Sequence, residues 1–373
     1  MYNPSVSYED YFRLREQPFS NAPDARYYFD SSQHSEALLR LKHAARTNVG
    51  LAVLVGDIGA GKTTLARQLL DDLDEREFES ALLVIVHSSI TSEWLLRKIA
   101  TQLGVEVIPE GKIETLAAIY HRLLKIREEG RKAVVLIDEA QMLQSRELME
   151  DFRGLLNLEL PAHKLITFIF FGLRSLDQTL ALDEPLQQRV ALRYRLSAMG
   201  LDSTAAYIRH RLQVAGGPDR EIFRPEAMQL IHRYARGIPR LINVICDNCL
   251  FEAYLIRKDH IDASVVEGVV ADLGLKAGTR APAATAAATA PQAPRAPQAA
   301  MNPQVPKDPL VPKNPLVPKN PLVPKNPQAA QTPAAPAINS VPGAAPPRNP
   351  STRRVDSLLN REEIESLGLL REI

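Results

Sequence analysis

An eight-residue run of the type that cradles phosphate groups lies near the start of the sequence. Residues 56–63, Gly-Asp-Ile-Gly-Ala-Gly-Lys-Thr, fit the pattern G-x-x-x-x-G-K-[S/T]. In this pattern the backbone N–H groups and the start of a helix face the phosphates, the lysine reaches the β- and γ-phosphates, and the hydroxyl binds Mg²⁺. We therefore expect ATP and Mg²⁺ as cofactors, although the pattern alone also admits GTP. The expected nucleotide-binding residues are Gly56, Asp57, Gly59, Ala60, Gly61, Lys62, Thr63 and Thr64.

Two carboxylates end an apolar stretch further along the chain. Residues 134–137, Val-Val-Leu-Ile, precede Asp138 and Glu139. At the end of a strand near a phosphate loop, an aspartate can hold the metal ion and a neighbouring glutamate can polarise the attacking water. We expect Asp138, with Thr63, to be a metal ligand and Glu139 to be the catalytic base. Gln141 either joins this polar cluster or begins a solvated helix.

Two arginines are candidates for contacts with the γ-phosphate. Arg189 lies at an expected helix end before the last strand, where ring-forming nucleotidases need an arginine that reaches the neighbouring subunit. Arg240 follows Pro239 in the first turn of a later helix, whose start the proline fixes. We expect Arg189 to act in catalysis from the neighbouring subunit and Arg240 to sense the nucleotide, the alternative for Arg240 being a surface arginine.

The order of the expected elements indicates an α/β protein with a parallel sheet, followed by a small all-helical domain. Apolar runs predict strands near 51–55, 81–86, 133–137 and 165–171, and a fifth within 186–194. Helical periodicity lies between them and continues alone near 202–214, 225–235, 238–255 and 262–272. We divide the chain into an N-terminal segment (1–47), an ATPase core (48–200) and a small all-helical domain (201–275), followed by a spacer (276–350) and an amphipathic helix (351–373).

The spacer differs sharply from the rest in composition. Residues 1–275 carry 33 Lys and Arg against 38 Asp and Glu, whereas residues 276–373 carry 12 against 6. Proline recurs at every third position from Pro303 to Pro327, within repeats of the form Val-Pro-Lys-Asn-Pro-Leu. Because polyproline II has three residues per turn, these prolines would form one stripe on a semi-rigid, Pro-rich spacer. The repeats are either a solubilising spacer or a docking strip for a partner.

The C-terminal segment regains helical periodicity from Asp356 to Leu370. A helix of this length is marginal alone in water, so we expect it to fold against a protein partner or against its own core.

Cysteine usage and hydropathy indicate a protein of the cytoplasm. Cys246 and Cys249 cannot form a disulfide framework, and without further ligands of suitable spacing they indicate core packing rather than a zinc site. The longest apolar stretch, near 165–173, is too short to span a bilayer, and the N-terminus has no signal-peptide pattern. We expect a cytoplasmic protein, with attachment to the inner membrane only through partners.

In combination, these motifs resemble the AAA+ ATPases of the ExeA/GspA type, which are known from the general secretion pathway. The resemblance covers about residues 1–272. It rests on the aromatic N-terminal signature at 11–27, His34-x2-Ala37-Leu38, the phosphate loop, Ile137-Asp138-Glu139-Ala140-Gln141, Gln188-Arg189, the run 206–212 and Gly237-Ile238-Pro239-Arg240-Leu241-Ile242-Asn243. The resemblance implies that the N-terminal segment (1–47), around Phe19 and Tyr27, packs near the adenine of the nucleotide. It also implies that the all-helical domain (201–275) is a lid.

Two departures from that family limit what the resemblance implies. Family members often carry a polar sensor residue after the fourth sheet strand, whereas this chain has Phe171-Gly172-Leu173-Arg174. The sensor is then Leu173, Arg174 or absent, and slow hydrolysis is expected. Secretion-type members also continue into a transmembrane helix and a wall-binding domain, where this chain has the spacer and the short helix.

Three functional readings follow. The first is an oligomeric ATPase that drives or regulates assembly of a secretion, pilus or exopolysaccharide-export apparatus through its C-terminal tail. The second is an ATPase of the transposition-regulator type that polymerises on DNA, which the near-neutral charge disfavours. The third is an adaptor that changes shape on binding ATP and hardly hydrolyses it.

Overall fold

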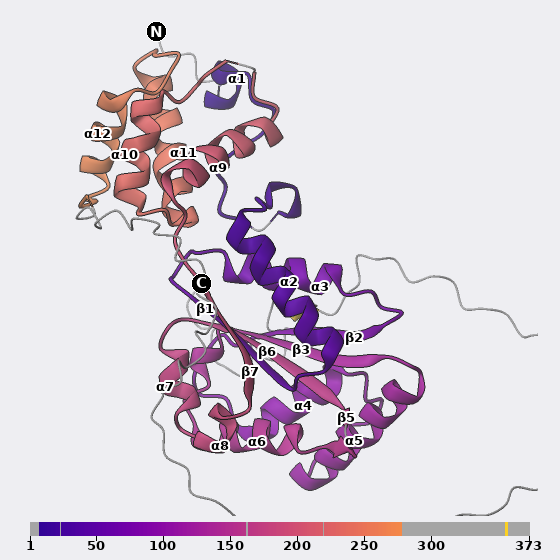
Figure 1. Cartoon of the computed structure of the whole chain (residues 1–373). Coiled ribbons are helices and arrows are strands. Elements are labelled where there is room, and N and C mark those ends of the chain that lie inside the picture. Colours follow the sequence, from indigo (N-terminus) through magenta and orange to yellow (C-terminus); the bar gives the residue numbers. More distant parts are fainter. Residues whose placement is uncertain (1–6, 23, 162, 219, 278–354, 357–373) are drawn as a thin grey trace, which may run out of the picture. The chain divides into compact units, whose positions relative to one another are not determined.

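A parallel β-sheet is the centre of the computed structural model, which describes residues 7–22, 24–161, 163–218, 220–277 and the backbone of 355–356 (Figure 1). The strand order is β7-β1-β6-β3-β2-β8, and every pairing in this sheet is parallel. Its strands are β1 (Leu51–Gly56), β2 (Phe78–Val84), β3 (Lys132–Asp138), β6 (Ile166–Gly172), β7 (Val190–Leu196) and β8 (Val355–Asp356), and a separate antiparallel pair joins β4 (Glu159–Leu160) to β5 (His163–Lys164).

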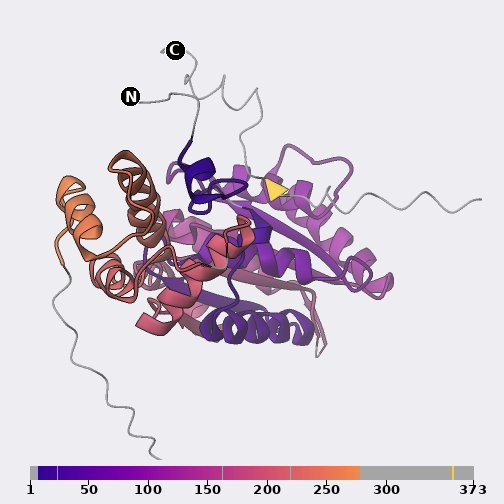
Figure 2. The ribbon, with the colours of Figure 1, turned by 90° about the horizontal axis from the view of Figure 1, so that it is seen from above.

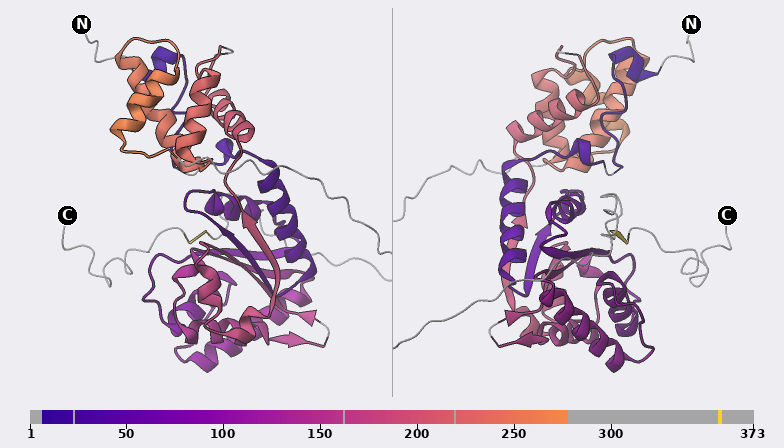
Figure 3. Two further views of the ribbon diagram at one scale, coloured as in Figure 1. Left: turned by 60° about the vertical axis from the view of Figure 1, so that its left-hand side comes forward. Right: turned by 90° about the vertical axis from the view of Figure 1, so that its right-hand side faces the viewer.

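Helices cover both faces of this sheet, as Figures 1 and 3 show, and this explains why its inner strands are mostly apolar. Successive side chains of β1 alternate between the faces. Leu51 and Val53 belong to one cluster with the helices that follow β2 and β3, whereas Ala52 and Leu54 belong to another with α2 and α3. These helices are α2 (Ser32–Thr47), α3 (Lys62–Asp72), α4 (Ser92–Gln102), α5 (Lys112–Glu128), α6 (Arg146–Leu156), α7 (Leu176–Leu180) and α8 (Glu184–Gln187), with a 3-10 turn η2 (Ala140–Met142) after β3.

A third apolar cluster lies among the helices that follow the sheet, which we call the lid. These helices, coloured salmon to orange in Figures 1 and 2, are α9 (Leu201–Val214), α10 (Pro225–Ala235), α11 (Pro239–Leu255) and α12 (Ala263–Asp272). Cys246 and Cys249 are buried in this cluster as free thiols, and burial raises the pKa of Cys246.

The first residues of the chain pack into the lid and not against the sheet. Helix α1 (Tyr8–Phe12) lies against α11, and the ring of Tyr11 meets the ring of Tyr254 edge-on at 5.6 Å (Figure 1). Phe12 is fully buried in the lid cluster. The 3-10 turn η1 (Ala25–Tyr27) contacts α9, and only from α2 onward does the chain join the sheet. The lid core is thus built from both ends of the described chain.

The parallel sheet followed by helices confirms the α/β architecture expected from the alternation of elements. The C-terminal segment begins differently from the expected helix, because the structure places Asp356 in β8, paired with Leu83 of β2. The Pro-rich repeats and residues 357–373 lie outside the described residues. No helix among the described residues is both long and apolar enough to cross a membrane.

Candidate nucleotide site

The loop between β1 and α3 has the backbone geometry of a phosphate cradle. Gly59 has φ +76° and Gly61 has φ +96°, a left-handed region that glycine enters without strain. A Cβ at Gly59 would also lie 2.8 Å from Cβ of Arg240. Gly61 is the N-cap of α3 and has no side chain to cap the helix, so the first N–H groups of α3 are available to an anion.

Lys62 is held inside this loop. Its side chain is only 6% exposed, and Nζ donates a 3.0 Å hydrogen bond to the carbonyl of Asp57. Burial lowers the pKa of Lys62, and the nearby charges of Glu139 and Asp138 oppose that shift. The ammonium group of Lys62 is thus held at the loop by a hydrogen bond to a backbone carbonyl. A phosphate oxygen can replace that carbonyl as the acceptor.

Thr63 and Asp138 meet at the end of β3. The Thr63 hydroxyl donates a 2.6 Å hydrogen bond to Oδ2 of Asp138, and the backbone N–H of Glu139 donates to Oδ1 at 2.9 Å. Asp138 is fully buried, and burial raises the pKa of its carboxyl against the effect of these two hydrogen bonds. One hydroxyl oxygen and one carboxylate beside a phosphate cradle are donors that suit Mg²⁺.

Glu139 adopts an unusual backbone conformation for a residue with a side chain. Its φ is +54° and its ψ is +34°, in the left-handed region. Its carboxylate accepts a 2.5 Å hydrogen bond from Nε2 of Gln141, and the residue lines the same cavity as Lys62 and Thr63. The turn at Glu139 therefore aims a second carboxylate at the cavity next to the buried Asp138.

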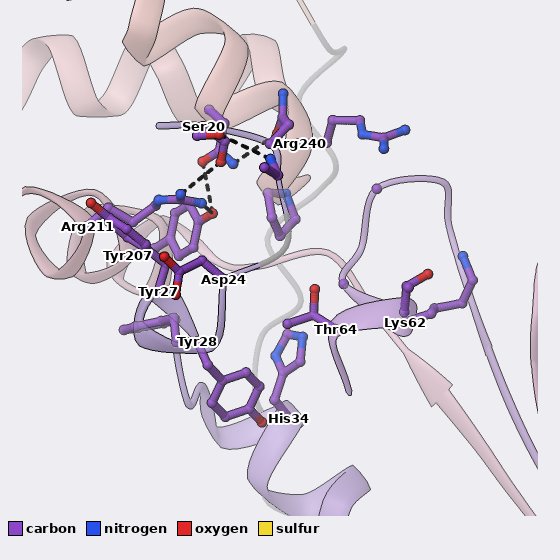
Figure 4. Close-up of a pocket in the computed structure, with 18 of the residues that line it drawn as sticks. Ser20, Asp24, Tyr27, Tyr28, His34, Lys62, Thr64, Tyr207, Arg211 and Arg240 are labelled. Atoms are coloured by element: carbon purple, nitrogen blue, oxygen red, sulfur yellow. Dashed lines mark hydrogen bonds between the residues drawn. The ribbon is translucent and has the colours of Figure 1, made fainter. Parts of the chain in front are cut away.

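The cavity has a volume of about 450 Å³ and is shared by three parts of the chain. The phosphate loop and Glu139 line one side, and the segment before α2 and the lid line the rest (Figure 4). Tyr28 and His34 lie side by side next to Thr64 in Figure 4, their rings edge-on at 6.4 Å. The segment contributes Ser20, Asn21, Ala22, Asp24, Tyr27, Tyr28, Phe29 and His34, and the lid region contributes Met199, Tyr207, Arg211, Pro239, Arg240 and Asn243.

His34 packs against the phosphate loop at Ala60 and Gly61. The ring of His34 is buried, and its Nδ1 lies 2.6 Å from Oγ of Ser31, which caps α2. A Cβ on Gly61 would come 3.0 Å from Nε2 of His34, and the backbone of Ala60 is a hydrogen-bond partner of the ring. Burial lowers the pKa of His34. The sequence offered this residue only as part of a family signature, because no spacing rule assigns a histidine to a phosphate loop.

A buried polar network joins the lid to the N-terminal segment. Arg211 donates to the carbonyls of Pro18 at 2.5 Å and Ser20 at 2.8 Å, and also to the hydroxyl of Tyr207. That hydroxyl in turn donates to Asn243 at 2.8 Å, and Asn243 donates to Asn21 at 3.0 Å. The Arg211 guanidinium also lies 4.5 Å from the ring centre of Tyr27. Tyr207, Arg211 and Asn243 fall in the two lid motifs of the sequence, which were the available signal for them.

The structure brings Arg240 to the expected loop and leaves Arg189 away from it. The backbone N–H of Arg240 donates to the carbonyl of Gly59 at 3.4 Å, and Arg240 lines the cavity. Arg189 instead donates to Oδ1 of Asn157 and precedes β7. Strand β7 runs parallel to β1, with Leu51 beside Val190. Arg189 therefore lies at the amino ends of the strands, whereas the phosphate loop lies at the carboxyl end of β1, about 20 Å away along the strands.

Arg174 follows β6 and pairs with the phosphate loop. Nη2 of Arg174 donates a hydrogen bond to Oδ2 of Asp57 at 2.9 Å, and both side chains are half-exposed. Leu173 lines the cavity beside it. Of the sensor alternatives left open by the sequence, Arg174 is the one whose side chain contacts the loop, whereas the backbone N–H of Leu173 donates to Oε1 of Gln141.

The chain is similar to a known domain family and to solved structures of other proteins. The family described as "AAA domain" matches residues 45–180. Solved structures of the *Aeropyrum pernix* ORC2 protein in ADPNP and ADP complexes (TM-score 0.53, 17% identity, 69% of this chain and 71% of that one) and of Cdc6p from *Pyrobaculum aerophilum* (TM-score 0.52, 19% identity, 68% and 70%) share the architecture. At these identities, the likeness shows the fold.

A curated relative gives the more specific comparison. "General secretion pathway protein A" of *Aeromonas hydrophila* is 38% identical over 250 residues, which are 66% of this chain and 45% of the relative. The chain thus spans less than half the length of that relative. Together with the matched AAA domain, this identity confirms the resemblance to the AAA+ ATPases of the ExeA/GspA type that the motifs indicated.

Proposed function

We propose that this protein binds Mg²⁺ and ATP in the cavity described above and hydrolyses ATP to ADP and phosphate as an oligomer. The observation that carries the proposal is that Lys62, Thr63 and Glu139 line one cavity and that Thr63 is hydrogen-bonded to the buried Asp138. Lys62 and the N–H groups at the start of α3 would hold the phosphates, and Thr63 and Asp138 would hold Mg²⁺. Thr64 and the glycines of the loop complete the cradle.

Glu139 is the proposed general base. Its carboxylate faces the cavity, where it can orient a water for in-line attack on the γ-phosphorus and accept the proton of that water. The bond between the γ-phosphorus and the β,γ-bridging oxygen breaks, and ADP leaves with the electron pair. Arg240, which adjoins Gly59, would sense the nucleotide from the lid.

Arg189 supports an oligomeric enzyme. It lies at the amino end of β7, so it cannot reach the loop of its own chain at the carboxyl end of β1. It is partly exposed, with its bond to Asn157 at the surface, and is free to enter the site of a neighbouring copy. We propose that Arg189 of one subunit stabilises the charge that develops on the γ-phosphate in the next.

The relative named for general secretion suggests the process that hydrolysis serves. We propose that the protein drives or regulates assembly of a secretion, pilus or exopolysaccharide-export apparatus. The C-terminal tail would recruit a protein partner, and any attachment to the inner membrane would come through that partner. Removal of residues 351–373 should then leave ATPase activity intact and abolish recruitment of the partner.

The rate of ATP hydrolysis at increasing protein concentration tests this proposal, with Lys62→Ala as the inactive control. A rate per subunit that rises with concentration supports an oligomeric ATPase. Strong stimulation by duplex DNA would instead favour the transposition-regulator class. A Glu139→Gln variant separates the adaptor class, because an ATPase should lose turnover and accumulate as an ATP-bound oligomer, whereas an adaptor should change little.

A further inference from the structure

Gln141 is a buried residue that contacts Glu139 but is not one of the residues that line the cavity. It follows Glu139 in the turn η2, and its side chain is only 7% exposed. Nε2 donates to Oε2 of Glu139 at 2.5 Å, and Oε1 accepts the backbone N–H of Leu173 at 3.0 Å. The side-chain amide therefore uses its donor on the proposed base and its acceptor on the residue that follows β6.

The end of β6 is shaped to receive this amide. A Cβ on Gly172 would come 2.9 Å from Oε1 of Gln141, so the close approach requires a residue without a side chain. The carbonyl of Gln141 also accepts a 3.4 Å hydrogen bond from the buried hydroxyl of Thr179 in α7. Side-chain and backbone atoms of Gln141 are thus fixed by the segment that follows β6.

The strained turn at Glu139 needs such support. A glutamate with φ +54° is held in a sparsely populated conformation that the surroundings must stabilise. No other side-chain hydrogen bond to the Glu139 carboxylate is found among the described residues. The direction of this carboxylate in the cavity therefore depends on the amide of Gln141.

We propose that Gln141 is a positioning residue for hydrolysis. Its amide orients the Glu139 carboxylate and makes that orientation depend on where the β6–α7 segment lies. The segment includes Arg174, which pairs with Asp57 of the phosphate loop, so a change at the γ-phosphate side can reach the base through Gln141. The inference rests on the proposed function, because it assigns Gln141 a role through Glu139.

Gln141→Ala should lower kcat by about 10- to 100-fold, the effect expected when a reacting group is misplaced by about 1 Å. The KM for ATP and the Kd for ADP should stay within about twofold, because Gln141 does not line the part of the cavity that binds phosphates. Gln144→Ala is the matched control, since Gln144 is an exposed glutamine in the same turn region. It should keep wild-type kcat.

A double-mutant cycle separates positioning from a general structural role. In the Glu139→Gln background, measured by release of radiolabelled phosphate over hours, adding Gln141→Ala should cause no further loss, because the group it acts through is gone. Equal losses in both backgrounds, or a wild-type kcat for Gln141→Ala, would overturn the inference. Absence of turnover in the wild-type protein would instead overturn the proposed function, and with it the reaction in which Gln141 acts.

Discussion

The hydroxyl of Thr63 donates a 2.6 Å hydrogen bond to Oδ2 of Asp138, and this bond joins the first turn of α3 to the carboxyl end of β3. It holds together the two side chains that we assign to Mg²⁺. Thr63→Val keeps the shape of the side chain and removes the hydroxyl. We expect the Mg²⁺ concentration for half-maximal activity to rise by about 10-fold or more, since one oxygen donor is lost. Binding of ATP in EDTA, followed by fluorescence of a labelled analogue, should be unchanged.

Lys62→Ala should weaken binding of ATP by about 100-fold or more, because a buried cation at the phosphates is replaced by a methyl group. Equilibrium binding measured by calorimetry checks this. Lys125→Ala, which removes an exposed lysine of α5, is the control and should bind as the wild type does. Retained binding in the Lys62 variant would contradict the assignment of the site.

Arg189→Ala should leave binding of ATP unchanged and lower kcat by about 10³-fold, the loss typical of a catalytic arginine. Mixing it with the inactive Glu139→Gln protein gives a sharper test. In such a mixture, an Arg189→Ala subunit still carries Glu139, and a neighbouring Glu139→Gln subunit still carries Arg189. A site formed between these two subunits therefore has both groups. In a random equal mixture about a quarter of the sites are of this kind, so activity should rise to about that share of the wild-type rate if the arginine acts in trans.

Arg174→Ala tests whether the residue after β6 takes part in hydrolysis. Its ion pair with Asp57 is half-exposed, so the free energy of unfolding should change by less than about 1 kcal/mol. We expect kcat to fall while the Kd for ADP stays constant, because ADP lacks the γ-phosphate. Arg193→Ala removes a comparable exposed pair with Asp177 and serves as the control. Equal activities of the two variants would exclude Arg174 as a sensor.

The pH dependence of stability should report on His34. Burial lowers the pKa of His34 in the folded protein, so the unfolded chain takes up a proton first as the pH falls. The contribution of His34 to stability is complete above its unfolded pKa of about 6.5 and is lost as the pH falls towards the folded value. Burial also lowers the pKa values of His210 and His232. The effect of His34 is therefore isolated by comparing the wild-type protein with the His34→Gln variant. The difference in urea unfolding free energy between the two proteins should shrink from pH 7.5 to pH 5.

The sequence predicted the elements of the fold closely wherever periodicity was long. The lid helices expected near 225–235 and 238–255 are found at Pro225–Ala235 and Pro239–Leu255, because a proline fixes the first turn of each. The second strand was expected near 81–86 and is found at Phe78–Val84. Its first residues carry Glu79 and Ser80, so the apolar run began later than the hydrogen-bonded strand.

The sequence predicted only some of the residues of the candidate site. Lys62, Thr63, Asp138 and Glu139 follow patterns that fix spacing, and the structure brings Lys62, Thr63 and Glu139 to one cavity with Asp138 bonded to Thr63. Long-range contacts leave no such pattern. Nothing local to Gln141 indicates that its amide reaches the backbone of Leu173, and nothing local to Pro18 indicates that its carbonyl accepts from Arg211. Such contacts depend on tertiary packing rather than on spacing along the chain.

The construction of the lid core from both ends of the described chain has a mechanical consequence. Within residues 7–277, the chain passes between the lid and the sheet before α2 and again after β7, and the two passages lie side by side. Gln33 bridges them, since its Oε1 accepts the N–H of Ser197 at 3.0 Å and its Nε2 donates to the carbonyl of Ala198 at 3.5 Å. Two adjacent backbone connections permit fewer directions of movement between the lid and the sheet than a single connection does. We therefore expect any movement of the lid, and of Arg240 against Gly59, to be a rotation about the axis through these two connections.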